Sequence, residues 1–166
     1  MKIYMNVLPR QSKKTGMLIN KFVETLKTKK FDIFNKPEQL FMCQTDQIMK
    51  DTAERVAMQM KGHLDDYLGL TVTEIKQRLV DNHIVVTSKR FVDMVNESLL
   101  DPLKYNDVFI DDYLMMTEQD QKFVNSCYSG SDQQLNRITL HVNTTPGRLI
   151  HKGIYKLAVF CRKHSY

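Results

Sequence analysis

The spacing of apolar residues changes along this chain, and that change restricts the possible folds more than any other feature. Residues 2–8 alternate, with Ile3, Met5 and Val7 on one side. Apolar residues between positions 17 and 127 mostly recur three and four apart, whereas residues 137–143 and 154–161 again resemble strands. Alternation is typical of a half-buried β-strand, and a spacing of three to four is typical of an amphipathic helix. The sequence therefore predicts strands at both ends and helices between them.

This order of segments predicts an α+β fold. We expect the N-terminal strand to pair with a C-terminal hairpin that turns at residues 145–147, which gives a small, mostly antiparallel sheet with helices packed on one face. The chain has 166 residues, with six glycines and four prolines. That length suffices for one hydrophobic core, and no composition boundary divides it. We expect a single domain over residues 1–166.

Local signals position the predicted helices. Asn35 and Pro37 have the pattern of a helix start, and Thr71 with Glu74 has the spacing of a capping box. The β-branched segment 83–87 predicts a short strand, after which Ser88 is expected to cap another helix. The predicted helices span residues 17–29, 35–68, 72–81, 88–99 and 106–127.

Charge is distributed unevenly beneath a formal net charge of +5. Residues 1–30 contain eight basic side chains and one acidic one, and residues 137–166 contain six basic side chains and no acidic one. The segment between them, residues 31–136, contains ten basic and eighteen acidic side chains. If the two ends share one sheet, they form a basic surface that attracts a polyanion, while the acidic helices face elsewhere.

The alternation of the terminal strands indicates which side chains would form that surface. If Leu140 and Val142 face the core, His141 and Asn143 face outward, and Tyr4 and Phe160 are outward on their own strands. Cations neutralise phosphates, and aromatic rings stack on unpaired bases. Solvated lysines and arginines on a half-exposed strand are the plain structural alternative. The predicted nucleic-acid-binding residues are Lys2, Tyr4, Arg10, Lys13, Lys14, Arg137, His141, Arg148, Lys152, Lys156, Phe160 and Arg162.

A helix-turn-helix unit in residues 71–99 is an alternative way of binding nucleic acid. Lys89 and Arg90 lie in the first turn of the predicted second helix, where a recognition helix contacts DNA. Leu79 and Phe91, the apolar residues on either side of the linker, are twelve positions apart, which is a longer separation than in a compact helix-turn-helix unit. This spacing favours two packed helices that do not bind DNA. A winged-helix variant, with the turn at 145–147 as the wing, stays open.

A His-dependent ribonuclease-like enzyme is a second alternative. His141, His151 and Tyr155 flank one turn, and histidine supplies both protonation states near neutral pH. The sequence shows no carboxylate partner close to them. The same histidines fit a basic nucleic-acid surface, so we predict that the protein is not an enzyme.

Other classes of site have less support. The glycines are isolated, and Cys43, Cys127 and Cys161 are far apart, so neither a cofactor nor a metal site is predicted. Their odd number indicates reduced thiols in the cytoplasm. No stretch of 18 apolar residues exists, so no membrane-spanning helix is expected.

The acidic segment allows two further partners. Asp107, Asp111, Asp112, Glu118 and Asp120 would make one helix strongly negative. This helix could bind a host protein, or it could meet the basic ends of another copy in a homo-oligomer. A plain solvated helix face is the structural alternative, and it is the favoured one. The main prediction is a cytoplasmic, non-enzymatic protein that binds RNA or single-stranded nucleic acid. We interpret it as a phage or viral regulatory protein.

Overall fold

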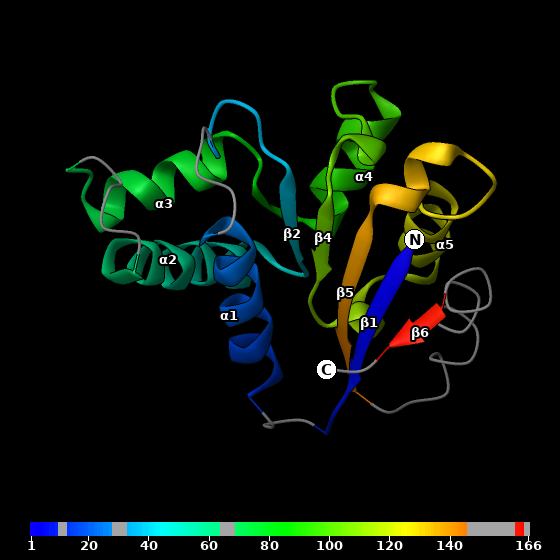
Figure 1. The fold of residues 1–166 in the computed structure, drawn as a ribbon, viewed down its shortest axis with the longest axis horizontal. Helices are drawn as coiled ribbons and strands as arrows, with labels where there is room; N and C mark the ends of the chain where they lie inside the picture. The colour runs from blue at the N-terminus through cyan, green and yellow to red at the C-terminus, as the bar shows by residue number, and fades with distance from the viewer. Residues whose placement is uncertain (10–12, 28–32, 64–68, 146–161, 165–166) are drawn as a thin grey trace.

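The computed structural model describes residues 1–9, 13–27, 33–63, 69–145 and 162–164. Its strands form one sheet in the order β3-β2-β4-β5-β1-β6, and every neighbouring pair is parallel (Figure 1). The strands are β1 (Lys2–Val7), β2 (Gln39–Cys43), β3 (Val85–Thr87), β4 (Asp107–Ile110), β5 (Thr139–Thr144) and β6 (Arg162–His164).

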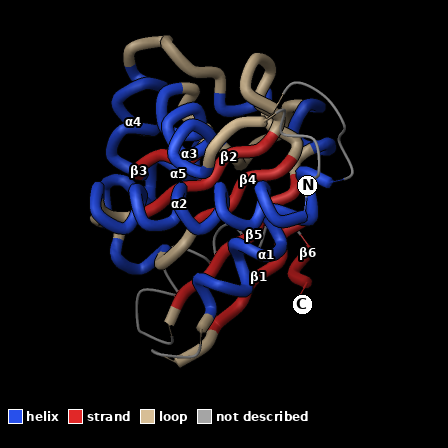
Figure 2. The backbone as a smooth tube through the Cα atoms, turned by 90° about the vertical axis from the view of Figure 1, so that its left-hand side faces the viewer, coloured by secondary structure: helices blue, strands red, loops and turns tan. Residues whose placement is uncertain are grey.

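Helices cover both faces of this sheet. They are α1 (Lys14–Lys27), α2 (Asp46–His63), α3 (Val72–Asp81), α4 (Ser88–Asn96) and α5 (Glu118–Cys127), with short 3₁₀ turns η1 (Pro102–Lys104), η2 (Tyr113–Met115) and η3 (Gln133–Arg137). Figure 2 looks onto the face that α1, α2 and α3 cover, and α4 and α5 lie behind the sheet.

The core is accordingly divided into two layers by the sheet. Phe22 of α1, Val56 of α2 and Leu79 of α3 pack on the face that carries Phe41 and Phe109. On the other side, Phe91 of α4 and Val124 of α5 pack against the opposite face of the same strands. A sheet buried on both faces has no polar outer face, and its strands become nearly continuous apolar runs.

The predicted antiparallel sheet is wrong. All strand pairs in the described residues are parallel, and helices cross from the end of one strand to the start of the next, as parallel pairing requires. The N-terminal strand does lie between two C-terminal strands, with Lys2 in register with Thr139 of β5 and Arg162 of β6. The predicted turn at 145–147 and strand at 154–161 lie almost entirely outside the described residues.

Two strands were missed in segments predicted to be helical. Residues 35–68 contain β2 before α2 begins at Asp46, and residues 106–127 contain β4 before α5 begins at Glu118. β2 is buried at all five positions, so its apolar run carries no alternation to distinguish it from a helix. Asp107 opens β4, and Asp111 and Asp112 follow it, so these three acids do not belong to the predicted acidic helix.

Signals confined to a few neighbouring residues were more reliable. The capping box of α3 is present as predicted. The Thr71 hydroxyl oxygen accepts a hydrogen bond from the Glu74 backbone amide, and the Glu74 carboxylate accepts one from the Thr71 backbone amide. Strand β3 lies within the predicted segment 83–87, although Thr87 rather than Ser88 caps α4. Because β3 joins the sheet between α3 and α4, the helix-turn-helix alternative for residues 71–99 is wrong.

Neither of the two cysteines in the described residues forms a disulfide. Cys43 is buried at the end of β2 and Cys127 is half-buried at the end of α5. Burial raises the pKa of the Cys43 thiol to about 12, against the opposing effect of its contact with Thr52, and burial raises that of Cys127 to about 11. No helix in the described part of the chain has both the length and the apolar composition to cross a membrane.

Candidate functional site at the carboxyl edge of the sheet

The path of the chain singles out one place along the carboxyl edge of the sheet. After β2 the chain moves outward to β3, whereas after β4 it moves the opposite way to β5, although β2 and β4 are neighbours. The connections that leave these two strands therefore diverge. In open parallel sheets, ligands bind at the carboxyl ends of strands where the order reverses in this way.

Polar side chains gather at this point. Gln44 follows β2, and its Nε2 donates to the Asp111 carbonyl oxygen at 2.9 Å and to the Ser88 hydroxyl oxygen at 3.0 Å. Ser88 is the first residue of α4, and Asp111 directly follows β4. One amide thus connects the carboxyl ends of three neighbouring strands.

The Asp111 carboxylate extends these contacts to α1 and β5. The Thr15 hydroxyl donates to its Oδ2 at 2.9 Å, and Asn143 Nδ2 donates to its Oδ1 at 3.4 Å. The same Nδ2 donates to the Lys14 carbonyl oxygen, and Asn6 of β1 donates to Asn143 Oδ1 at 3.2 Å. These contacts fix the first turn of α1 to the ends of β1, β4 and β5.

Burial and neighbouring charges both act on the Asp111 carboxylate. Asp111 is 1% exposed. Burial raises its pKa, as does the neighbouring Asp112, while the hydrogen bonds from Thr15 and Asn143 oppose the shift. Lys14 is also buried, and its Nζ lies 3.8 Å from Asp112 Oδ1. Lys14 therefore balances negative charge inside the protein.

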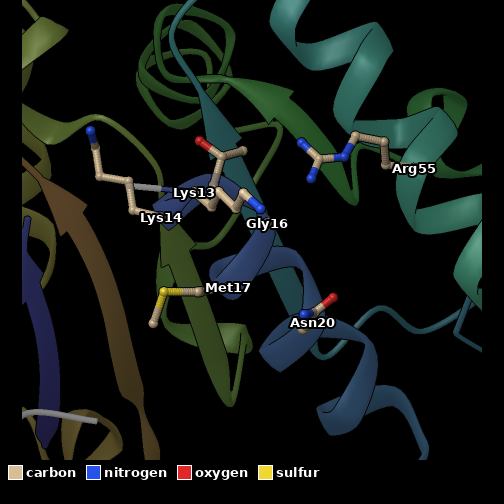
Figure 3. Close-up of a pocket in the computed structure, with 7 residues that line it drawn as sticks. Lys13, Lys14, Gly16, Met17, Asn20 and Arg55 are labelled. Atoms are coloured by element: carbon tan, nitrogen blue, oxygen red, sulfur yellow. The ribbon is translucent and has the colours of Figure 1, made fainter. Parts of the chain in front are cut away.

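Beside this cluster, the first turn of α1 and the middle of α2 line an open cavity of about 640 Å³ (Figure 3). It is lined by Lys13, Lys14, Thr15, Gly16, Met17, Asn20 and Arg55. Lys13 and Arg55 are exposed, and neither has an ion-pair partner among the described residues. The first turn of α1 carries no acidic side chain, and a helix N-terminus is favourable for anions. The lining therefore suits a phosphate group.

The glycine at position 16 allows the two helices to approach here. A Cβ at this position would lie 3.1 Å from Arg55 Nη2. Figure 3 shows the Arg55 side chain extending from α2 toward the first turn of α1. The guanidinium consequently lies over that turn, where it can share an anion with the α1 backbone and Lys13.

The structure separates the predicted binding residues into different regions. Lys13 and Lys14 line the cavity, whereas Lys2 and Arg137 lie exposed at the opposite, amino edge of the sheet. Tyr4 is half-buried on β1, and Arg162 belongs to β6. Arg10, Arg148, Lys152, Lys156 and Phe160 lie outside the described residues, as do His151 and Tyr155. Thr15, Gly16 and Arg55 also line the cavity, and none of them was predicted as a binding residue.

His141 was predicted to face outward, and the structure places it in the interior. It is 2% exposed, and its ring stacks on Phe109 at 4.1 Å and on Tyr4 at 5.5 Å between ring centroids. Its neighbour on the same face, Asn143, is buried as well. The outward orientation was inferred from alternation on a sheet with one free face, and here helices cover both faces.

A carboxylate partner for His141 is nevertheless present. Asp107 Oδ1 lies 3.0 Å from His141 Nε2, although 34 residues separate them in sequence. Burial lowers the His141 pKa, and Lys21 acts in the same direction, against the opposing effect of Asp107. In this enclosed position His141 has no access to a nucleic-acid backbone. No group of three or more potential metal ligands occurs among the described residues.

Comparison with known proteins gives a result for the fold alone. Neither a protein-family model nor a curated protein sequence matches the chain. A solved structure of a hypothetical ATP-dependent RNA helicase from Sulfolobus tokodaii superposes on 99% of it, with a TM-score of 0.62 and 16% identity. The yeast DEAD-box splicing factor Prp28 also superposes on 99%, with a TM-score of 0.66 and 16% identity.

The chain has a RecA-type α/β fold. This match agrees with the parallel sheet and again overturns the predicted antiparallel arrangement. The aligned region covers 48% of the Sulfolobus protein and 41% of Prp28, so this chain spans less than half the length of either.

Proposed function

We propose that this chain is an RNA-binding domain that holds the RNA backbone at the carboxyl edge of its sheet. The observation that carries the proposal is the cavity of about 640 Å³ between α1 and α2, where Lys13, Arg55 and the first turn of α1 converge. Its position beside the reversal of strand order supports the same location. Both structural neighbours are described by their names as RNA helicase or DEAD-box splicing factor, which supports RNA as the ligand class.

The lining residues suggest how RNA would bind. Lys13 and Arg55 supply charge for a backbone phosphate, and the amides of the first turn of α1 supply hydrogen-bond donors. Met17 is half-exposed beside them and offers an apolar contact for a sugar or a base. Phosphate contacts of this kind fix position and give little sequence preference.

A charge-reversal pair tests the location. The double variant Lys13→Glu, Arg55→Glu should weaken binding of a labelled single-stranded RNA roughly tenfold or more, and flatten the salt dependence by about 0.7 per lost phosphate contact. The measurement is fluorescence anisotropy at several salt concentrations. Both side chains are exposed, so thermal unfolding should change little.

A matched control is available at the opposite edge of the sheet. Lys2→Glu, Arg137→Glu changes the net charge by the same amount, and both residues are exposed. This pair should leave affinity within about threefold of the original at moderate salt, because charges more than a Debye length away are screened. Equal loss in both pairs would show attraction by overall charge and contradict the proposed site.

One outcome would identify a different ligand. Saturable binding of ATP that depends on Lys13 and Arg55, together with RNA binding that ignores both residues, would assign the cavity to nucleotide phosphates. That result would reject the RNA proposal for this site.

A further inference from the structure

We propose that Asp111 is a positioning residue for RNA binding, acting through the Thr15 hydroxyl to hold the first turn of α1 against Arg55. This inference rests on the proposed function, because it concerns the same cavity. Asp111 does not line the cavity, whereas Thr15 does. The carboxylate therefore acts on the ligand through another residue.

Both oxygens of the Asp111 carboxylate accept hydrogen bonds. Oδ2 accepts from Thr15 at 2.9 Å and Oδ1 from Asn143 at 3.4 Å, and the side chain is almost fully buried. A buried carboxylate that loses a donor retains the cost of its burial, so this arrangement strongly favours one position for the Thr15 hydroxyl.

The backbone of Asp111 is held at the carboxyl edge of the sheet. Its amide donates to the Met42 carbonyl oxygen at 3.0 Å, and its own carbonyl accepts from Gln44, so its backbone is held by the end of β2. Asn143 is held in turn by Asn6 of β1. Asp111 thus transmits the position of a rigid sheet edge to a helix that begins after a connecting segment.

The first turn of α1 positions residues that line the cavity. Thr15 directly precedes Gly16, where an added Cβ would lie 3.1 Å from Arg55 Nη2. A small rotation or shift of the first turn would change the distance between Lys13, the α1 amides and Arg55. Ligand affinity is sensitive to such placement, because groups already held in the binding geometry lose less conformational entropy when the ligand binds.

Two substitutions at Thr15 separate the hydroxyl from the shape of the side chain. Thr15→Val keeps the shape and removes the donor, and it should weaken RNA binding by roughly 3- to 30-fold and flatten the salt dependence. Thr15→Ser keeps the donor and removes a methyl group, and it should restore most of the affinity. A merely structural role in packing would produce the reverse order.

A double-variant comparison tests the coupling to the cavity. In the Arg55→Glu background, Thr15→Val should cause much less further loss than it does alone, because the contact that it positions is already absent. Asp111→Ala should reproduce the effect of Thr15→Val, and adding Thr15→Val to it should have little further effect. Circular dichroism at the assay temperature establishes that each variant is folded, and Thr15→Val suffices for the test if Asp111→Ala does not fold.

The outcomes distinguish the inference from the function on which it rests. The inference is overturned if Thr15→Val binds RNA with normal affinity, or if Thr15→Ser and Thr15→Val lose affinity equally. The proposed function still stands in that case, provided that the double variant Lys13→Glu, Arg55→Glu loses RNA affinity. Normal affinity of Lys13→Glu, Arg55→Glu overturns the proposed function and this inference with it.

Discussion

Two hydrogen-bonded polar pairs lie on the same face of β4 and β5, and their surroundings differ. His141 is buried within the sheet, where its ring is stacked between Phe109 and Tyr4. Its partner Asp107 opens β4 and is partly exposed. Asp111 and Asn143 lie at the carboxyl edge and continue into the first turn of α1. Both pairs satisfy polar atoms, and the second continues through Thr15 into the lining of the cavity between α1 and α2.

This difference separates stability from binding. A paired group surrounded by rings contributes to packing, and its loss should lower the free energy of unfolding. A group at the edge of a parallel sheet also determines the arrangement of the loops where ligands bind. Burial and hydrogen bonding alone would not distinguish the two pairs, whereas their position along the strands does.

The largest effect is expected from breaking the enclosed region. Phe109 is fully buried and contacts His141, Phe22 and Phe41 through its ring. Phe109→Ala should lower the free energy of unfolding by about 3–5 kcal/mol, as large-to-small substitutions of core aromatic residues do. Urea denaturation followed by circular dichroism measures this loss. RNA affinity per folded molecule should be retained, and a large fall in that affinity would show that the two regions are not separable.

A smaller effect is expected from pH. Burial lowers the pKa of His141 below its ordinary value of 6.5, so the unfolded chain binds a proton more readily than the folded protein. The contribution of this residue to stability is therefore fully present above about pH 6.5 and is lost as the pH falls below it. His141→Gln should flatten the dependence of unfolding free energy on pH between 7 and 5.

The control for this pH prediction lies in the other pair. The Asp111 pKa is raised by burial, so its stabilising contribution has the opposite sign and decreases as the pH rises through the folded pKa. Thr15→Val changes the surroundings of Asp111 and should leave the loss of stability below pH 6.5 in place. If Thr15→Val removed that loss and His141→Gln did not, the assignment to His141 would be wrong.

Local sequence signals predicted part of this fold. The capping box at Thr71 and the alternation of residues 2–8 act over a few neighbours and gave α3 and β1 correctly. β2 was missed because a helix-start pattern at Asn35 and Pro37 precedes a strand that is buried on both faces. The parallel direction depends on how helices cross the sheet, which the spacing of apolar residues does not encode.

The candidate site was predictable only where its residues are close in sequence. Lys13 and Lys14 form part of a basic segment, and the structure places both at the cavity. Arg55 belongs to the charged face of a long helical pattern and gives no separate signal. The contact between Thr15 and Asp111 joins residues 96 positions apart, and that between Asp107 and His141 joins residues 34 apart. Such pairs arise from strand order and so require the fold.

The smallest effect is expected from Gly16→Ala, and it should move stability and binding in opposite directions. Alanine in a helix is favoured over glycine by about 0.5–1 kcal/mol, so the free energy of unfolding should rise by up to that amount. The added methyl group meets the flexible end of Arg55, which has to shift by a few tenths of an ångström. RNA affinity should therefore fall by about twofold, a small change on the free-energy scale.

The matched control is Gly62→Ala near the end of α2, where an added Cβ has no heavy atom within 4 Å. It should give a comparable gain in stability through the same helix preference, and it should leave RNA affinity unchanged. Thermal unfolding and anisotropy titrations on both variants separate the two effects. If Gly16→Ala lowers stability and affinity together, the methyl group distorts the first turn of α1. If it raises stability without changing affinity, the position of Arg55 does not matter for binding, and the edge region contributes through charge alone.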